Sequence, residues 1–198
     1  MEWTELADDE TVERTAEALR KRNVDVMVVN TGVDAKTKVL ELLPKGVEIM
    51  QASSTTLDQI GVSQELEESG NYRALRKSIK SIDDPKQRYD ARRKALGAEY
   101  AVGSVQAVTE AGQIVVASAS GSQIPLYSYG AANVILVVGT QKIVKDLDAA
   151  MKRIYEYALA LESKRIGKGS SVNKIYLLER EGQQGRVRLI FVKERLGF

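Results

Sequence analysis

The sequence contains no cysteine and no histidine. The missing cysteine excludes a disulfide, a cysteine zinc site and an iron–sulfur cluster held by this chain. The missing histidine excludes the Ser-His-Asp and Cys-His arrangements of nucleophilic catalysis. Any acid–base chemistry must therefore use Asp, Glu, Lys or Tyr. We expect no metal site, and the sequence indicates no particular cofactor.

Long apolar runs are missing as well. No stretch approaches the roughly 18 apolar residues of a membrane-spanning helix, and the first 25 residues are acidic without the apolar core of a signal peptide. The lack of cysteine is compatible with a reducing compartment. We therefore expect a cytoplasmic protein with no membrane partner. Its 198 residues, 43% hydrophobic and 28% charged, are typical of a single globular domain spanning residues 1–198.

The net charge of +2 is too small to indicate a nucleic-acid partner, but the charges are unevenly distributed. Residues 1–70 carry 7 basic and 15 acidic side chains, and residues 71–198 carry 22 and 12. This asymmetry is typical of solvated surface, and it would also suit an anionic ligand, an acidic partner or a homo-oligomer. Residues 62–98 form a mostly helical, basic segment with a weak apolar stripe. We expect that segment on the surface or against another subunit.

The first half of the chain alternates between helix and strand. Asp8 or Asp9 caps an opening helix, and the β-branched run at 24–29 predicts a buried strand. A helix over 33–42 and a strand over 47–50 follow. This strand–helix–strand order predicts two parallel strands paired through a right-handed crossover.

The second half is richer in strands. A tight turn at 110–112 leads into a strand over 113–117, and the run at 134–138 predicts the most buried strand of the chain. A helix over 145–160 follows, with one apolar face. The apolar runs at 175–178 and 187–192 are joined by a glycine-rich turn, which predicts a terminal hairpin.

Small polar residues follow three of the predicted strands, at 30–32, 51–56 and 139–140. Ligands of open α/β sheets bind beyond the carboxyl ends of the strands, and free backbone amides there favour anions. The sequence therefore predicts a site for a small anionic metabolite. The candidate ligand-binding residues are Ser53, Ser54, Thr55, Thr56, Gly103, Ser104, Thr109, Gly121, Gly130, Gly139 and Thr140.

Each candidate also has a simpler interpretation. The hydroxyls at 53–56 could contact a ligand, or Ser54 or Thr55 could merely cap a helix. The Ser/Gly loop at 118–123 could cradle a ligand or serve as a flexible connection. Glu110 and Lys142 are the candidate catalytic residues. Glu110 could act as a base or nucleophile, or be an exposed turn residue. Lys142 opposes a helix dipole, which suits an anionic partner, but solvated surface is the alternative.

Several segments together resemble the LUD (lactate-utilisation) family. They are residues 55–61, 103–112, 129–130, 134–150 with Arg153, and 194–198, so the resemblance covers nearly the whole chain. It implies a LUD-type domain with a three-layer α/β/α sandwich and a largely parallel sheet, similar to the NagB/RpiA/CoA-transferase superfamily. It also implies a link to lactate utilisation, where one member resembles an accessory subunit beside iron–sulfur partner proteins.

The chain departs from that pattern in two places. Gln141 stands where asparagine is usual before Lys142, and the cysteines that many relatives carry after Arg165 are missing. These departures argue against a redox role. Three hypotheses remain open. In the first, the protein binds a ligand or serves as an accessory subunit in lactate or organic-acid utilisation. In the second, it is a transferase or isomerase of the CoA-transferase or sugar-phosphate type that uses Glu110 and Lys142, and in the third it only interacts with partners.

Overall fold

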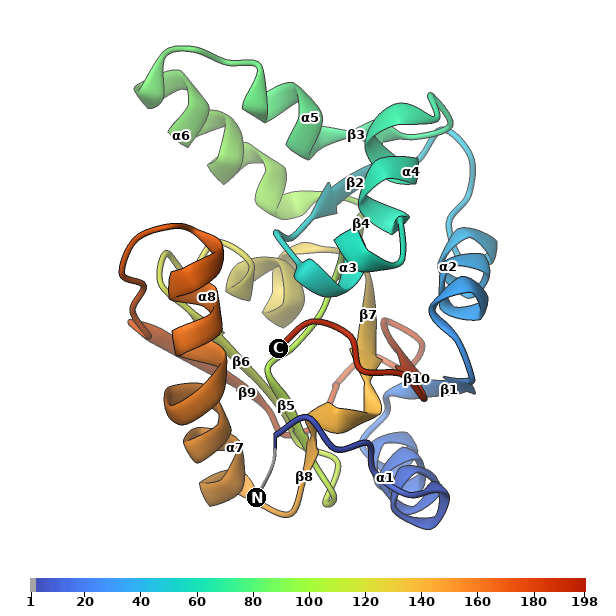
Figure 1. Cartoon of the computed structure of the whole chain (residues 1–198). Helices are drawn as coiled ribbons and strands as arrows, with labels where there is room; N and C mark the ends of the chain where they lie inside the picture. Colours follow the sequence, from blue (N-terminus) through green and yellow to red (C-terminus); the bar gives the residue numbers. More distant parts are fainter. Residues whose placement is uncertain (1–2) are drawn as a thin grey trace.

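The computed structural model describes residues 3–198, and its centre is a six-stranded sheet in which every pair is parallel. The strand order is β1-β10-β7-β4-β2-β3 (Figure 1). The strands are β1 (Asp25–Val29), β2 (Glu48–Gln51), β3 (Arg73–Ala74), β4 (Tyr100–Gly103), β7 (Asn133–Gly139) and β10 (Val187–Val192).

The central strands are apolar at successive positions because both faces of the sheet are covered. In β7, Val134, Leu136 and Val138 pack into one core cluster. Ile135 and Val137 pack into the cluster on the opposite face. A continuous apolar run is typical of parallel strands buried on both sides. The prediction that 134–138 forms a deeply buried strand is confirmed.

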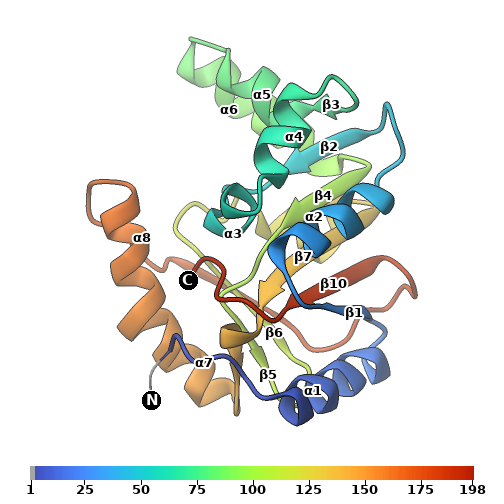
Figure 2. The ribbon, with the colours of Figure 1, turned by 45° about the vertical axis from the view of Figure 1, so that its right-hand side comes forward.

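Three helices cover one face of this sheet: α2 (Gly32–Glu41), α3 (Thr55–Gln59) and α4 (Val62–Glu68). Val39, Leu57 and Leu66 are their main contacts with the strands. A capping box begins α2, because Thr31 accepts a hydrogen bond from the Asp34 amide and Asp34 accepts one in return. Figure 2 shows these helices lying along the sheet.

The other face is covered by α1 (Asp9–Lys21) and a second, smaller sheet with the order β8-β5-β6-β9. Its outer side packs against a nearly continuous helix formed by α7, η4 and α8. The predicted three-layer arrangement around a mostly parallel sheet is confirmed, with the second sheet as part of its third layer. The bounds are β5 (Ala107–Thr109), β6 (Ile114–Ser118), β8 (Ile143–Val144), β9 (Lys174–Leu178), α7 (Leu147–Arg153), η4 (Ile154–Ala158) and α8 (Leu159–Arg165).

Two predicted strand pairings are wrong. The predicted hairpin is absent because β9 pairs with β6 of the second sheet, whereas β10 lies between β1 and β7. The run at 187–192 is buried on both faces, so it is stabilised at the sheet centre rather than beside β9. Likewise, β1 and β2 are not neighbours, because β10, β7 and β4 lie between them. Sequence order did not reveal that later strands insert there.

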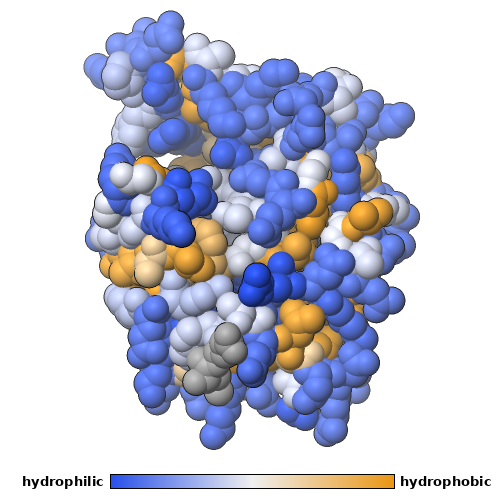
Figure 3. All heavy atoms as spheres, in the orientation of Figure 1, coloured by the Kyte–Doolittle hydropathy of each residue, from blue (hydrophilic) through white to orange (hydrophobic). Residues whose placement is uncertain are grey.

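The basic segment at 62–98 is mostly helical, as expected. After α4 and β3 it contains α5 (Leu75–Lys80), α6 (Pro85–Lys94) and η1 (Ala95–Gly97). Asp84 caps α6 and Pro85 occupies its first turn, but α6 buries no side chain. Helices α5 and α6 lie beyond the β3 edge of the sheet (Figure 1), and the surface of this region is mostly hydrophilic (Figure 3). None of the helices within residues 3–198 combines the length and apolar character needed to cross a bilayer.

Candidate functional site

The carboxyl ends of β2, β4 and β7 meet because these strands are neighbours in the sheet. Thr56 follows β2, Ser104 follows β4 and Lys142 follows β7 at the end of η3 (Thr140–Lys142). The Nζ of Lys142 donates hydrogen bonds of 3.1 Å to Thr56 Oγ1 and of 3.1 Å to Ser104 Oγ. The two hydroxyls are 3.3 Å apart. The structure thus joins three of the predicted site residues in one cluster.

Lys142 is buried, with only 2% of its surface exposed. Its hydrogen-bond partners within residues 3–198 are hydroxyls rather than carboxylates. Burial, and to a lesser degree the positive charge of Arg153, together lower the pKa of Lys142 to about 7. Near neutral pH the side chain can therefore be an ammonium or a neutral amine.

Arg153 is a second buried cation on this side of the molecule. Its Nη1 donates to the carbonyl of Gln106 at 2.6 Å, and its guanidinium lies 5.3 Å from the centre of the Tyr157 ring. Its Nε and Nη2 have no hydrogen-bond partner among the described residues. Burial lowers the pKa of Arg153 to about 10, so the group remains charged at neutral pH.

Above Lys142 lies a cavity of about 480 Å³ between the strand ends, α5, α6 and α8. The surface is visibly hollowed between the α5–α6 region and α8 (Figure 3). One acidic side chain lines the cavity, Glu162, which is held 2.7 Å from Arg165. Its lining contains five basic side chains, namely Arg76, Lys80, Arg92, Lys142 and Arg165. Glu67, outside the lining, pairs with Arg76 at 3.6 Å and with Lys80 at 3.0 Å. The five cations still outnumber these two acidic side chains, so the cavity is electropositive.

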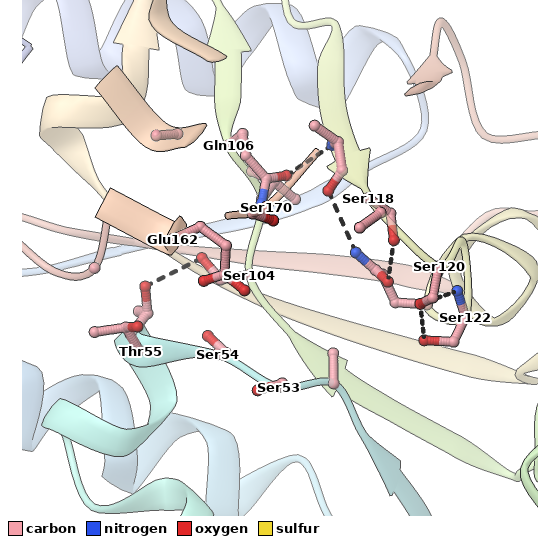
Figure 4. A pocket seen from close by; sticks show the side chains of 18 of the residues that line it. Ser53, Ser54, Thr55, Ser104, Gln106, Ser118, Ser120, Ser122, Glu162 and Ser170 are labelled. Atoms are coloured by element: carbon pink, nitrogen blue, oxygen red, sulfur yellow. Dashed lines mark hydrogen bonds between the residues drawn. The ribbon is translucent and has the colours of Figure 1, made fainter. Parts of the chain in front are cut away.

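Hydroxyl groups line much of the remaining wall. Figure 4 shows the loop with Ser53, Ser54 and Thr55 facing the loop after β6 across Ser104. Ser54 accepts a hydrogen bond from the Leu57 amide, so it caps α3 as its simpler interpretation required. The buried Oγ1 of Thr55 has no partner within residues 3–198. A ligand could therefore satisfy it.

The loop at 118–123 is ordered by its own hydrogen bonds. Ser118 Oγ accepts from the Gly121 amide at 2.8 Å and donates to Gln123 Oε1 at 2.9 Å. Gly121 has a φ of +83°, and the neighbouring hydroxyls of Ser118, Ser120 and Ser122 line the cavity. The loop thus presents side-chain hydroxyls to the cavity while its glycine makes the turn.

The last residues of the chain cover the lysine. Gln141 Nε2 donates to the Leu196 carbonyl at 2.8 Å, and Gln59 accepts from the Gly197 amide at 2.7 Å. A Cβ at Gly197 would lie 3.2 Å from Lys142 Nζ and would clash with the Thr56 hydroxyl. The side chain of Gln141 thus helps to hold the segment that closes the cavity floor.

Three predicted glycines are needed for close packing and do not line the cavity. A Cβ at Gly103 would clash with the Tyr127 hydroxyl, and one at Gly130 with the Leu96 carbonyl. A Cβ at Gly139 would lie 2.6 Å from the Glu194 carbonyl oxygen. Two predicted threonines also lie outside the lining. Thr109 donates to Gln113, and the buried hydroxyl of Thr140 has no partner within residues 3–198.

Glu110 is not brought to the cavity. It lies in the turn between β5 and β6, where Arg14 Nη2 donates to its carboxylate at 2.8 Å. The catalytic roles of Glu110 and Lys142 stay predictions, but the two residues do not share one site. The sequence did not point to Arg76, Arg92 or Arg165, because basic residues on polar helices are typical of solvated surface.

The comparisons with known proteins agree on the fold. A DUF162 family protein from Deinococcus radiodurans has a similar crystal structure, with a TM-score of 0.57 and 12% identity over 95% of this chain and 98% of that chain. At this identity the likeness shows the fold alone. No curated protein sequence matches the chain. The family model of the LUD domain matches residues 12–192, and the chain therefore belongs to the LUD domain family.

Proposed function

We propose that this protein binds a small organic anion in the cavity above Lys142 and serves lactate or organic-acid utilisation, as an accessory subunit or by itself. The observation that carries the proposal is the cluster of Lys142, Thr56 and Ser104 at the floor of an electropositive cavity. A buried cation without a counter-ion is costly. A bound carboxylate or phosphate would supply the missing charge and satisfy the Thr55 hydroxyl.

The size and charge of the cavity support a metabolite rather than a macromolecule. Small-molecule sites commonly enclose about 300–1,000 Å³, and this cavity of about 480 Å³ lies within that range. The five basic side chains of the lining outnumber the acidic side chains beside them, Glu162 and Glu67, and this excess of positive charge attracts anions and raises their local concentration. The hydroxyls around the wall can then orient an anion through several hydrogen bonds.

Membership of the LUD family supports the link to lactate utilisation. An accessory role would place the protein beside iron–sulfur partners of a lactate-oxidising system, because this chain has no cysteine for a cluster of its own. The transferase or isomerase alternative depends on Glu110, and its ion pair with Arg14 outside the cavity lends that alternative no support.

A thermal-shift screen tests the proposal with lactate, other organic acids, sugar phosphates and acyl-CoA compounds. A ligand at a hundred times its Kd stabilises the native state by about 2.7 kcal/mol. For a chain of this size that raises the Tm by about 5–10 °C. The double variant Ser54→Ala/Thr55→Ala should lose the shift relative to its own ligand-free Tm.

Glu110→Gln is the matched control, because it removes a carboxylate outside the cavity and should keep the full shift. If the double variant responds as the wild type does, the loop at 53–56 is not part of the site. If none of these anions raises the Tm of the wild type, the proposal is wrong.

A further inference from the structure

The cavity floor holds a primary amine, a group whose chemistry differs from that of every hydroxyl around it. The chain has no cysteine and no histidine, so Lys142 is the strongest nucleophile that the cluster can offer. A hydroxyl can donate a hydrogen bond to an anion, as an amine can. An unprotonated amine can in addition attack a carbonyl carbon and expel its oxygen as water.

The surroundings of Lys142 favour the neutral, nucleophilic form. Its contacts are the hydroxyls of Thr56 and Ser104, and neither can hold an ammonium as a carboxylate would. Burial disfavours the charged form, and Arg153 repels it. With a pKa of about 7, the unprotonated amine is populated at neutral pH.

The same two hydroxyls are placed to move protons during a condensation. Each lies 3.1 Å from Nζ and can accept an N–H hydrogen bond while donating its own proton elsewhere. A carbonyl oxygen bound within reach of Ser104 could receive a proton as the C–N bond forms. Thr56 is held in place by the Leu196 carbonyl, at 3.3 Å, so its position does not depend on a ligand.

We propose that Lys142 forms a Schiff base with a 2-oxo acid bound in the cavity. This inference rests on the proposed function and names the substrate class of the same site. A 2-oxo acid fits because its carboxylate suits the basic lining, whereas its neighbouring ketone suits the amine. A 2-hydroxy acid has the same carboxylate but no ketone, so it can bind without reacting.

The step balances without an oxidant or a reductant. The Nζ lone pair attacks the ketone carbon, and the carbonyl oxygen takes up a proton to give a carbinolamine. The nitrogen lone pair then expels the hydroxyl, which takes a proton from a neighbouring hydroxyl such as that of Ser104 and leaves as water. The iminium formed in this way returns its N–H proton to that hydroxyl and becomes the neutral imine. The carbon–nitrogen double bond that results withdraws electrons from the bonds beside it, which activates them for cleavage.

Reductive trapping tests the inference on the full chain. The protein is incubated with pyruvate or with lactate in the presence of sodium cyanoborohydride, and intact mass and peptide mapping locate any adduct. Pyruvate should give one adduct per chain at Lys142, and lactate should give none. The rate should rise through about pH 7 and then level off, which a merely structural lysine would not show.

Lys142→Arg keeps a positive charge but lacks the nucleophile, so it should give no specific adduct. Exposed lysines such as Lys45 serve as internal controls for background labelling. The inference is wrong if pyruvate raises the Tm but gives no adduct at Lys142. It is also wrong if pyruvate raises the Tm but labels the surface lysines as readily as Lys142. In both cases the proposed function stands. If no anion raises the Tm and no adduct forms, both proposals fail.

Discussion

The Nζ of Lys142 lies 3.1 Å from the Oγ of Ser104, although the two residues are 38 positions apart. Their proximity follows from the pairing of β4 with β7, which places Gly103 opposite Leu136 and brings the two strand ends together. The site is therefore produced by sheet topology, and its central contact is between an amine and hydroxyls rather than an ion pair.

The pKa of Lys142 predicts how stability depends on pH. The group binds a proton with a pKa of about 7 in the folded chain and of 10.5 in the unfolded chain. Between these values the unfolded state binds more protons, so the free energy of unfolding contributed by Lys142 rises with pH. The slope is at most about 1.4 kcal/mol per pH unit.

Denaturant unfolding of the wild type and of Lys142→Met from pH 6 to pH 10 measures this contribution. Subtracting the Lys142→Met curve removes the titration of other groups. At pH 7 the variant should be at least as stable as the wild type, because it replaces a buried amine by an apolar side chain of similar length. Parallel curves over the whole range would show that the pKa of Lys142 is not lowered.

Gly103→Ala should destabilise the protein by about 1–3 kcal/mol, because its Cβ meets the buried hydroxyl of Tyr127. Tyr127→Phe removes that hydroxyl and should recover part of the loss. The recovery is partial because the ring carbon would still lie 2.8 Å from the new Cβ. A double-mutant cycle by chemical denaturation measures the coupling. Strictly additive effects would contradict the contact.

Gly197→Ala should expose Lys142. Its φ of +61° disfavours a side chain, and its Cβ would press on Thr56, so the covering segment must move. Gly46→Ala is the matched control, with a φ of +77° but no atom within 4 Å. Gly46→Ala should lose about 1–2 kcal/mol from the left-handed backbone alone, and Gly197→Ala should lose more because of its contact with Thr56. Acylation followed by peptide mapping should show faster labelling of Lys142 in Gly197→Ala alone, and equal labelling rates would refute the covering role.

Glu110→Gln should change little. The carboxylate is partly exposed and pairs with a half-exposed arginine, so the loss should be below about 1 kcal/mol. Anion binding measured by thermal shift should be unaffected, since the residue lies outside the cavity lining. A large loss of binding would show that Glu110 contributes to the site and would support the transferase or isomerase hypothesis.

The fold class could be predicted from the sequence because helices and apolar strands alternate in it. The strand order could not, since the position of β10 depends on burial between β1 and β7 rather than on the turn that precedes it. Local patterns report which residues avoid water, and they carry little information about which distant strand covers them.

The site was predicted in part. Ligand sites of α/β sheets form at the carboxyl ends of the strands, and this rule placed together three residues that follow strand ends, Thr56, Ser104 and Lys142. Glu110 was chosen as a turn carboxylate, and sequence alone cannot show that its turn lies outside the cavity. The buried guanidinium of Arg153 was not expected, because an arginine on an amphipathic helix is typical of a solvated position.

The central claim is that Lys142 forms the floor of an anion site, and isothermal titration calorimetry tests it most directly. The anion that stabilises the wild type most is titrated at pH 7 into the wild type and into Lys142→Met. The account predicts that the variant binds at least about tenfold more weakly, a loss of about 1.4 kcal/mol. Equal affinities in a folded variant would contradict it.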